Sequence, residues 1–276
     1  MSKTILITGA SSGFGLLTAR LALSHGWNVA ATAREPEKVV LGGESGGERV
    51  LAARLDVRDD DSIRKAVHLV LDRFKAIDAL VNNAGIGLVG AVEEIPRDDL
   101  ANQFQTNFFG AAALTRAVLP SMREKRSGEI VFVSSDLGRT GVPGLSSYCA
   151  AKHALEGWAE SLSHEVKPFG IGVTLVEPGA FRTGFHERSL ERVKSALEIS
   201  GPYAPLYAAL RDHFFSGPEP PTGEIVAEVI IRAAEGAISP LRVPVGGDSE
   251  EWVRRRFKAD EEAFIREIGE SLTGRE

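Results

Sequence analysis

A short glycine-rich stretch near the N-terminus, TGASSGFG at residues 8–15, restricts the possible fold more than any other feature. It follows TILIT (4–8), an apolar and β-branched run typical of a strand buried on both faces. A segment with apolar residues at helical spacing comes next and ends near Gly26. A glycine turn between a strand and a helix lets a phosphate approach the backbone and the free N–H groups of the helix start. The stretch predicts a dinucleotide-binding strand–turn–helix unit, with a plain tight turn as the alternative.

The rest of the chain continues this alternation of strands and helices. Further strands are expected at 27–33, 49–57, 77–85, 129–135, 171–179 and 241–245, and helices at 59–75, 98–123, 147–167 and 223–235. Such alternation implies a parallel sheet covered on both faces by helical crossovers. Because no linker divides the chain, residues 1–276 are predicted to form one α/β domain: a Rossmann fold with a doubly wound parallel sheet of about seven strands.

Two segments depart from this regular pattern. Residues 180–222 are rich in aromatic side chains and prolines and too long for an ordinary connection. We expect them to form a lid or substrate-binding loop over an apolar ligand, with an extra helical hairpin that only adds core as the alternative. Residues 249–276 form a charged C-terminal extension, with a helix expected over 249–270.

Composition narrows the classes of partner. The formal net charge of −6 argues against nucleic acid, and the basic run at 252–258 is flanked by acids, as on a solvated helix face; a phosphate or membrane patch is the alternative. A single cysteine, Cys149, allows no internal disulfide and no four-thiolate metal site, and no metal is expected. No apolar run reaches the ~18 residues of a membrane span. A strand begins almost at residue 1, so we expect no signal peptide and a cytoplasmic location.

The stretch SSYCAAKHAL (146–155) places Tyr148 and Lys152 four positions apart, on one face of a predicted helix. An ammonium beside a phenol favours the phenolate, so the pKa of Tyr148 is expected to fall from about 10 toward neutral. Hydride transfer makes or consumes an alkoxide and needs such a proton donor, together with a hydrogen bond to the oxygen. Taken alone, such a pair is more often two residues that only share the rim of an amphipathic helix.

The end of the second strand bears on the choice of cofactor. An acidic side chain there would bond the ribose 2′-hydroxyl of NAD, whereas an arginine accommodates the 2′-phosphate of NADP. The sequence reads ATAREPE, with Arg34 directly after the strand and Glu35 one position later. NADP(H) is therefore predicted, with NAD(H) as the alternative if the strand runs longer.

Together these segments resemble the short-chain dehydrogenase/reductase family over most of the chain. The residues that carry the resemblance are TGASSGFG (8–15), Asp56-Val57, NNAG (82–85), Asn107, Ser135, Tyr148-x3-Lys152 and PGAFRT (178–183), in family order. REPEKV, EPGAFRTGF and SPLRVPVGGD look like a subgroup related to retinol and 17β-hydroxysteroid dehydrogenases and to many bacterial oxidoreductases. That subgroup favours NADP(H) and apolar alcohols or ketones.

The resemblance implies a role for each catalytic residue. Tyr148 would be the general acid in reduction and the base in oxidation, and Lys152 would lower its pKa and bond the nicotinamide ribose. Ser135, rather than the adjacent Ser134, would hydrogen-bond the substrate oxygen as charge develops on it. Asn107, within the helix 98–123, would hold a water that links Lys152 to solvent.

The resemblance also implies the contacts of the cofactor. Asp56 and Val57 would border the adenine, residues 83–85 the adenosine side, and Pro178, Gly179 and Thr183 the carboxamide and diphosphate, while Asn82 is interpreted as structural. The full predicted set is Gly9, Ser11, Ser12, Gly13, Phe14, Gly15, Arg34, Asp56, Val57, Asn83, Ala84, Gly85, Tyr148, Lys152, Pro178, Gly179, Phe181 and Thr183. In this family, helices 98–123 and 147–167 would pair subunits into a homodimer or homotetramer.

The sequence thus predicts an NADP(H)-dependent oxidoreductase that interconverts an apolar secondary alcohol and its ketone, or an aldehyde. One alternative is a sensor that binds the dinucleotide without catalysis, and another is an NAD-dependent dehydrogenase of the same family. An epimerase or dehydratase of the family's longer branch is disfavoured by the glycine spacing and by the lack of a large C-terminal substrate domain.

Overall fold

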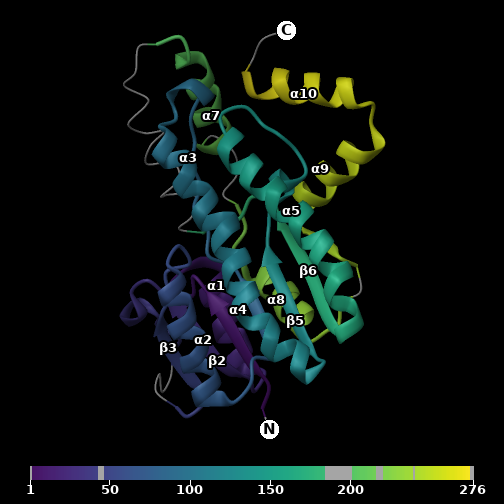
Figure 1. The fold of residues 1–276 in the computed structure, drawn as a ribbon. Helices are drawn as coiled ribbons and strands as arrows, with labels where there is room; N and C mark the ends of the chain where they lie inside the picture. The colour runs from purple at the N-terminus through teal and green to yellow at the C-terminus, as the bar shows by residue number, and fades with distance from the viewer. Residues whose placement is uncertain (1, 43–46, 184–200, 216–219, 239, 274–276) are drawn as a thin grey trace.

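A parallel sheet forms the centre of the protein (Figure 1). The computed structural model describes residues 2–42, 47–183, 201–215, 220–238 and 240–273. Within them the sheet has seven strands in the order β3-β2-β1-β4-β5-β6-β7. Their bounds are β1 (Thr4–Thr8), β2 (Asn28–Ala33), β3 (Val50–Arg54), β4 (Ala79–Asn82), β5 (Gly128–Val133), β6 (Ile171–Pro178) and β7 (Arg242–Val245). The predicted parallel sheet and its seven strands are confirmed.

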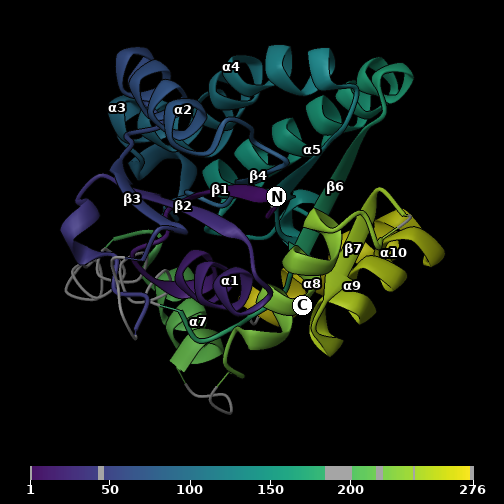
Figure 2. The same ribbon diagram turned by 90° about the horizontal axis from the view of Figure 1, so that it is seen from below.

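Helices cover both faces of the sheet, as Figure 2 shows. One face carries α2 (Asp60–Phe74), α4 (Gly110–Lys125) and α5 (Ser146–Val166); the other carries α1 (Gly13–Ser24) and α8 (Glu224–Ala234). Side chains of a strand alternate between faces, so Leu6 and Leu80 pack in the first layer while Ile5, Ile7 and Val81 pack in the second. All five are fully buried, which explains why the strands read as continuous apolar runs.

The order of the strands locates the ligand-binding edge of the sheet. β1 pairs with β2 on one side and β4 on the other, so the chain reverses its direction of winding between β1 and β4. In open parallel sheets, ligands bind at the carboxyl ends of the strands at such a switch point. The loops after strands β1 to β6 carry most of the predicted site residues, whereas Tyr148 and Lys152 lie on α5.

The helix expected over 98–123 is present, with a π-helical turn within it that the sequence did not predict. It consists of α3 (Arg97–Phe104), a π-helical turn (Gln105–Phe109) and α4. A π-turn inserts one residue into the helical repeat, a local change that apolar spacing does not report, and such turns are frequent at functional sites. Asn107 lies within this turn and is 2% exposed.

The C-terminal extension also differs from the prediction. The single helix expected over 249–270 is a pair, α9 (Gly247–Lys258) and α10 (Glu261–Thr273). Its basic run is paired with acids: Arg254 with Glu251 on α9, and Arg256 with Glu261 at the start of α10. The run is therefore a partly exposed ionic surface. This agrees with the interpretation of the run as a solvated helix face.

The aromatic segment 180–222 is not irregular throughout. It contains helix α7 (Ala204–Phe215), whereas residues 184–200 and 216–219 lie outside the described part of the chain. α7 lies beside α10 at the end of the molecule opposite the N-terminus (Figure 1). The two helices contribute to one apolar cluster with the start of α5, made of Val89, Val142, Leu145, Tyr148, Cys149, Tyr207, Leu210, Phe264 and Ile268.

Within the described residues, we find no helix with the length and apolar character needed to cross a membrane.

Candidate active site

The glycine loop between β1 and α1 is closely packed against the turn after β4. Gly9 has a φ of +67°, a conformation that L-residues rarely adopt. A Cβ on Gly15 would lie 2.5 Å from both the Gly9 carbonyl oxygen and Nδ2 of Asn83. Asn83 Nδ2 in turn donates to the carbonyl oxygen of Thr8 at 2.8 Å. The loop therefore keeps its shape only with glycine at position 15.

The start of α1 fits a phosphate group. Ser12 precedes the helix in an extended conformation without a side-chain cap, and the first turn, which begins at Gly13, contains no acidic residue. The N–H groups of such a turn favour an anion. Thr183, in the segment that follows β6, reaches the loop, since its Cβ lies 3.4 Å from the position of a Cβ on Gly13. The predicted glycine-loop and PGAFRT residues therefore meet, and the cradle fits a dinucleotide pyrophosphate.

Replacement of Gly15 by Ala is expected to weaken NADPH binding at least about tenfold, because the new Cβ must displace Gly9 or Asn83. The control is Gly157→Ala on α5, where nothing lies within 4 Å and the site is exposed. Fluorescence titration of NADPH and thermal unfolding of both variants provide the measurement. If the folded Gly15→Ala protein bound NADPH as well as the Gly157→Ala protein, the loop would not be the pyrophosphate site.

Charges at the end of β2 surround the predicted adenosine position. Arg34 follows the strand and is exposed. Glu35 pairs with Lys38 at 2.8 Å, and that hydrogen bond lowers the pKa of Glu35. The Arg58 guanidinium donates hydrogen bonds to both carboxylate oxygens of Asp56. This contact is the main cause that lowers the pKa of Asp56 to about 2. Arg34 also lowers the pKa of both acids through its charge, so both predicted adenosine carboxylates already have cationic partners.

The NNAG segment after β4 is mainly a structural tie. Asn82 donates from Nδ2 to the Thr115 hydroxyl on α4 at 3.1 Å, in agreement with its structural interpretation. The backbone N–H groups of Asn83 and Ala84 both donate to the Thr8 hydroxyl at 2.9 Å. These bonds hold residues 83–85 beside the glycine loop.

The predicted catalytic side chains come from two neighbouring elements. Tyr148 and Lys152 lie on α5, and Ser135 lies at the end of β5, where it begins a short 3-10 turn, η4 (Asp136–Gly138). Ser135 forms a side-chain hydrogen bond that lowers the pKa of Tyr148. The Nζ of Lys152 lies 5.7 Å from the Tyr148 ring centre and donates to the Val133 carbonyl at 2.8 Å. The structure thus brings the three predicted residues together, each less than a tenth exposed.

The structure contradicts the predicted fall in the pKa of Tyr148. Burial raises the pKa of Tyr148, and this outweighs the hydrogen bond from Ser135. Burial also lowers the pKa of Lys152 to about 8, against the opposing charge of Glu156. The sequence argument counted the nearby ammonium but not the removal of both groups from water, and desolvation disfavours the charged form of each.

Asn107 has a defined position but already uses its side chain. Its Oδ1 accepts from the Ile86 N–H, and its Nδ2 donates to the Ile86 carbonyl, both at 2.9 Å. The pair fixes the π-turn against the segment that follows β4. A role for Asn107 in holding a water near Lys152 remains a prediction.

The predicted PGAFRT residues after β6 do not all lie in one place: Thr183 contacts the glycine loop, whereas Phe181 packs in the core. Gly179 follows Pro178, the last residue of β6, and its N–H donates to the Val245 carbonyl at 3.0 Å. Phe181 is only 1% exposed, and its ring packs edge-on against that of Phe14 at 5.8 Å. The Phe181 ring therefore belongs to the core between α1 and β6.

The sequence analysis missed two parts of this neighbourhood. Asp136, directly after Ser135, places its carboxylate 2.9 Å from the Ser135 hydroxyl; a carboxyl next to the end of a buried strand was the available signal. Phe264 and Ile268 of α10 lie in the apolar cluster around Tyr148. Their i, i+4 spacing shows one apolar helix face, but not the element that it contacts.

Comparisons with known proteins agree with this geometry. A sequence model described as short chain dehydrogenase matches residues 3–194. Retinol dehydrogenase 8 of Bos taurus is 40% identical over 256 residues, which cover 87% of this chain and 80% of that protein. A short-chain dehydrogenase from Streptomyces avermitilis has a similar structure, with a TM-score of 0.81, 36% identity, and coverage of 98% of this chain and 96% of that chain.

Two solved structures with 26% identity contain a nicotinamide dinucleotide. A short-chain dehydrogenase/reductase from Burkholderia phymatum in complex with NAD has a TM-score of 0.77 and covers 93% of each chain. ElxO with NADP bound has a TM-score of 0.73, and the match covers 91% of this chain and 100% of that one. One of these two structural relatives therefore binds NAD and the other NADP.

Proposed function

Because the chain belongs to the short-chain dehydrogenase family of oxidoreductases, we propose that it uses NADP(H) to interconvert an apolar secondary alcohol and its ketone, or an aldehyde. The observation that carries this proposal is the convergence of Ser135, Tyr148 and Lys152 at the carboxyl ends of the strands, next to a glycine loop that fits a pyrophosphate.

In the reduction, the protein's task is to bind the carbonyl oxygen and give it a proton, while bound NADPH supplies the hydride. The Ser135 hydroxyl would donate to the oxygen as negative charge develops on it. Tyr148 would then transfer its phenolic proton to that oxygen. Burial, which raises the pKa of Tyr148, keeps the phenol in the protonated form from which it would donate. Lys152 would hold the nicotinamide ribose from the same helix face.

The preference for NADP(H) rests on Arg34. Its guanidinium lies at the end of β2, where the adenine ribose is expected, and Glu35 is already paired with Lys38. An arginine can bond a phosphate with two parallel N–H groups. A paired carboxylate is less available for the two ribose hydroxyls of NAD.

The apolar character of the substrate rests on the cluster around Tyr148. Leu145 and Val142 reach it from the connection before α5, and Phe264 and Ile268 reach it from α10. An apolar substrate would lie beside this buried cluster, with its oxygen at Tyr148. The similarity to retinol dehydrogenase 8 favours the same class of substrate, a long apolar alcohol or aldehyde.

The test is a panel of carbonyl compounds of increasing apolar length, from acetone through 2-decanone to retinal, with NADPH absorbance as the readout. The proposal predicts kcat/KM that rises with apolar length, since each buried CH₂ contributes about 0.8 kcal/mol. NADPH oxidation that is absent throughout the panel, or fastest with the shortest ketones, would contradict it. We also place the enzyme in the cytoplasm, where its single thiol, on the buried Cys149, would remain reduced.

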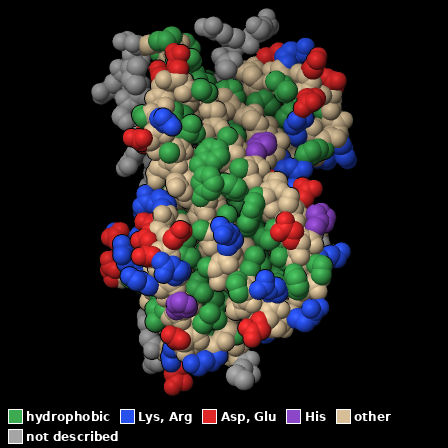
Figure 3. All heavy atoms as spheres, viewed as in Figure 1, with side chains coloured by type: hydrophobic (Ala, Val, Ile, Leu, Met, Phe, Trp, Pro, Cys, Tyr) green, Lys and Arg blue, Asp and Glu red, His purple; other side chains and the backbone are tan. Residues whose placement is uncertain are grey.

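We further propose that the protein forms a homodimer or homotetramer through the face of α4 and α5. Apolar side chains gather at the centre of this face (Figure 3). Phe109, the last residue of the π-turn before α4, is 52% exposed, and its ring lies 5.0 Å from that of Phe108, which contacts Trp158 of α5. Exposed apolar surface of this kind marks a contact with another chain, and a second copy offers the same surface.

Replacement of Phe109 by Asp is therefore expected to convert the oligomer into monomers, because it buries a charge at the centre of the contact. Light scattering coupled to size exclusion measures the mass. Val92→Asp is the matched control, since Val92 is also exposed, at 74%, but does not lie on α4 or α5. An unchanged mass for Phe109→Asp would remove this face as the interface.

A further inference from the structure

We propose that Asp136 is a positioning residue for carbonyl reduction that acts through Ser135. When Asp136 is ionised, its carboxylate accepts a hydrogen bond from the Ser135 hydroxyl, which then cannot donate to the substrate oxygen. When Asp136 is protonated, the Ser135 hydroxyl is free to donate to that oxygen. The proposal rests on the function proposed above, in which Ser135 donates to the substrate.

The geometry around the Ser135 hydroxyl carries this inference. The hydroxyl has one proton, and the groups around it are Asp136 Oδ1 at 2.9 Å, the Pro178 carbonyl at 3.5 Å and the Tyr148 hydroxyl, with which it also forms a hydrogen bond. The shorter bond goes to the carboxylate, and hydrogen bonds to a charged acceptor are about twice as strong as neutral ones. The Leu137 N–H approaches both oxygens, Asp136 Oδ1 at 2.8 Å and Ser135 Oγ at 3.2 Å. The turn therefore fixes carboxylate and hydroxyl side by side.

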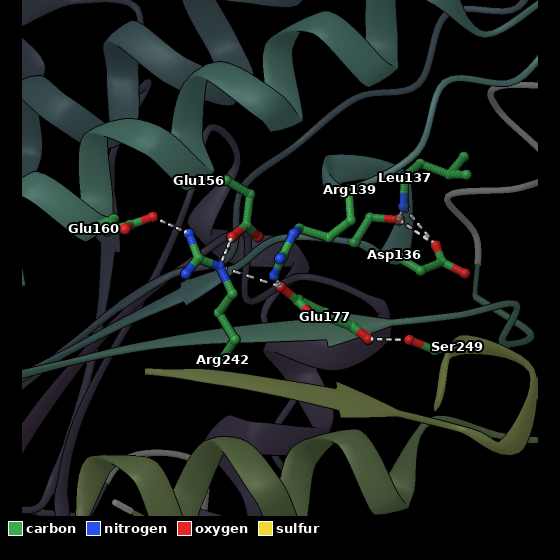
Figure 4. A network of polar contacts seen from close by, with 9 residues as sticks. Asp136, Leu137, Arg139, Glu156, Glu160, Glu177, Arg242 and Ser249 are labelled. Carbon is green, nitrogen blue, oxygen red and sulfur yellow. Dashed lines mark hydrogen bonds and ion pairs between the residues drawn. The ribbon is translucent and has the colours of Figure 1, made fainter. Parts of the chain in front are cut away.

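The charged groups around η4 leave Asp136 without a strong cationic partner in the described structure. Figure 4 shows Asp136 to one side of an ionic network in which Arg139 pairs with Glu177, and Arg242 with Glu156. Arg139, on the same turn as Asp136, is thus directed to β6.

The other neighbours of Asp136 are acidic or weakly ionised. Asp248 of α9 raises the pKa of Asp136 by its like charge, and Asp136 raises the pKa values of Tyr148 and Cys149 of α5 in the same way. Burial is the largest cause, and together with Asp248 it outweighs the hydrogen bond from Ser135 and raises the pKa of Asp136 to about 6. The group therefore titrates within the working range of an enzyme.

This competition for the Ser135 proton sets the direction of the pH dependence. Below about pH 6, Asp136 is protonated, and the Ser135 hydroxyl can donate to the substrate oxygen; above it, the carboxylate competes for the same proton. Loss of one such donor in an enzyme costs ~10²–10³ in rate, and competition for it costs less. We expect kcat/KM for reduction by the wild type to fall about tenfold between pH 5.5 and 7.5.

The test compares the pH profiles of the wild type and Asp136→Asn. The amide has the same shape and no charge, so the variant should lack the fall between pH 5.5 and 7.5 and exceed the wild type at pH 7.5. A purely structural role of Asp136 would lower activity equally at every pH. A profile with the same fall in both proteins would overturn the proposal.

Asp248→Asn gives a second, independent variant. Its amide oxygen can still accept from the Ala180 N–H, as the carboxylate does at 2.7 Å. Without the like charge, the pKa of Asp136 falls, and the limb of the activity profile should move to lower pH. A limb that stayed in place would show that it belongs to another group.

A measurement without turnover separates this inference from the proposed function. Ser135→Ala, Asp136→Asn and the double variant form a thermodynamic cycle in urea unfolding, which isolates the interaction of the two side chains. The coupling should be present at pH 7.5 and largely lost at pH 5, where Asp136 is protonated. Equal coupling at both pH values would refute the inference even if no ketone proved to be a substrate, whereas absent NADPH oxidation with pH-dependent coupling would refute only the proposed function.

Discussion

Tyr148→Phe should lower kcat for ketone reduction at least about 10²-fold and leave the Kd for NADPH unchanged. A general acid contributes typically 10²–10⁴-fold, and the phenolic hydroxyl, hydrogen-bonded to Ser135, is the proposed proton donor. Phe keeps the ring that packs with Leu145 and Cys149 in the apolar cluster. The loss should therefore fall on proton transfer rather than on folding.

Stopped-flow NADPH oxidation and fluorescence titration of NADPH measure the two parts of this prediction. Tyr203→Phe is the matched control, because the Tyr203 hydroxyl bonds Glu93 rather than the catalytic residues. The control should keep kcat within about threefold of the wild type. A Tyr148→Phe enzyme that retained kcat to the same extent would assign the proton donor to another group.

Replacing Arg34 by Glu should reverse the cofactor preference. The guanidinium at the end of β2 would be exchanged for a carboxylate that repels a 2′-phosphate and can accept from a ribose hydroxyl. The variant loses a charge-assisted bidentate contact and gains a repulsion. Together these should lower kcat/KM for NADPH relative to that for NADH about 10²-fold or more.

The measurement is kcat/KM for NADPH and for NADH with one ketone. Arg64→Glu makes the same change of charge on the surface of α2, where Arg64 is 66% exposed and paired with Asp61. It should leave the ratio of the two kcat/KM values unaltered. If Arg34→Glu affected NADPH and NADH equally, Arg34 would not contact the 2′-phosphate, and the NAD alternative would be favoured.

The sheet was predictable from the sequence because its inner strands are buried on both faces. β1 was predicted with the bounds that the structure shows, and β7 within one residue. A strand with helices packed on each side has no polar face, so its sequence is an uninterrupted apolar run bounded by turn residues. The glycine loop was predictable for a related reason, since its spacing reflects a backbone contact within a few residues of the chain.

The remaining features depend on contacts between distant segments. The π-turn around Asn107 is held by Ile86, twenty-one residues away in sequence, and α10 reaches Tyr148 from the far end of the chain. The pKa of Tyr148 was mispredicted because its sign depends on burial, which i, i+4 spacing does not show. Asp136 was overlooked because a carboxylate after a strand usually faces solvent.

We propose that this protein catalyses hydride transfer from NADPH to the carbonyl carbon of an apolar substrate. The most direct test supplies NADPH with deuterium in both C4 positions of the nicotinamide, together with the best ketone of the panel, and analyses the alcohol by mass spectrometry. We expect one deuterium per product molecule, bound to the carbinol carbon. An alcohol formed without deuterium, or NADPH bound but never consumed with any carbonyl compound, would contradict it.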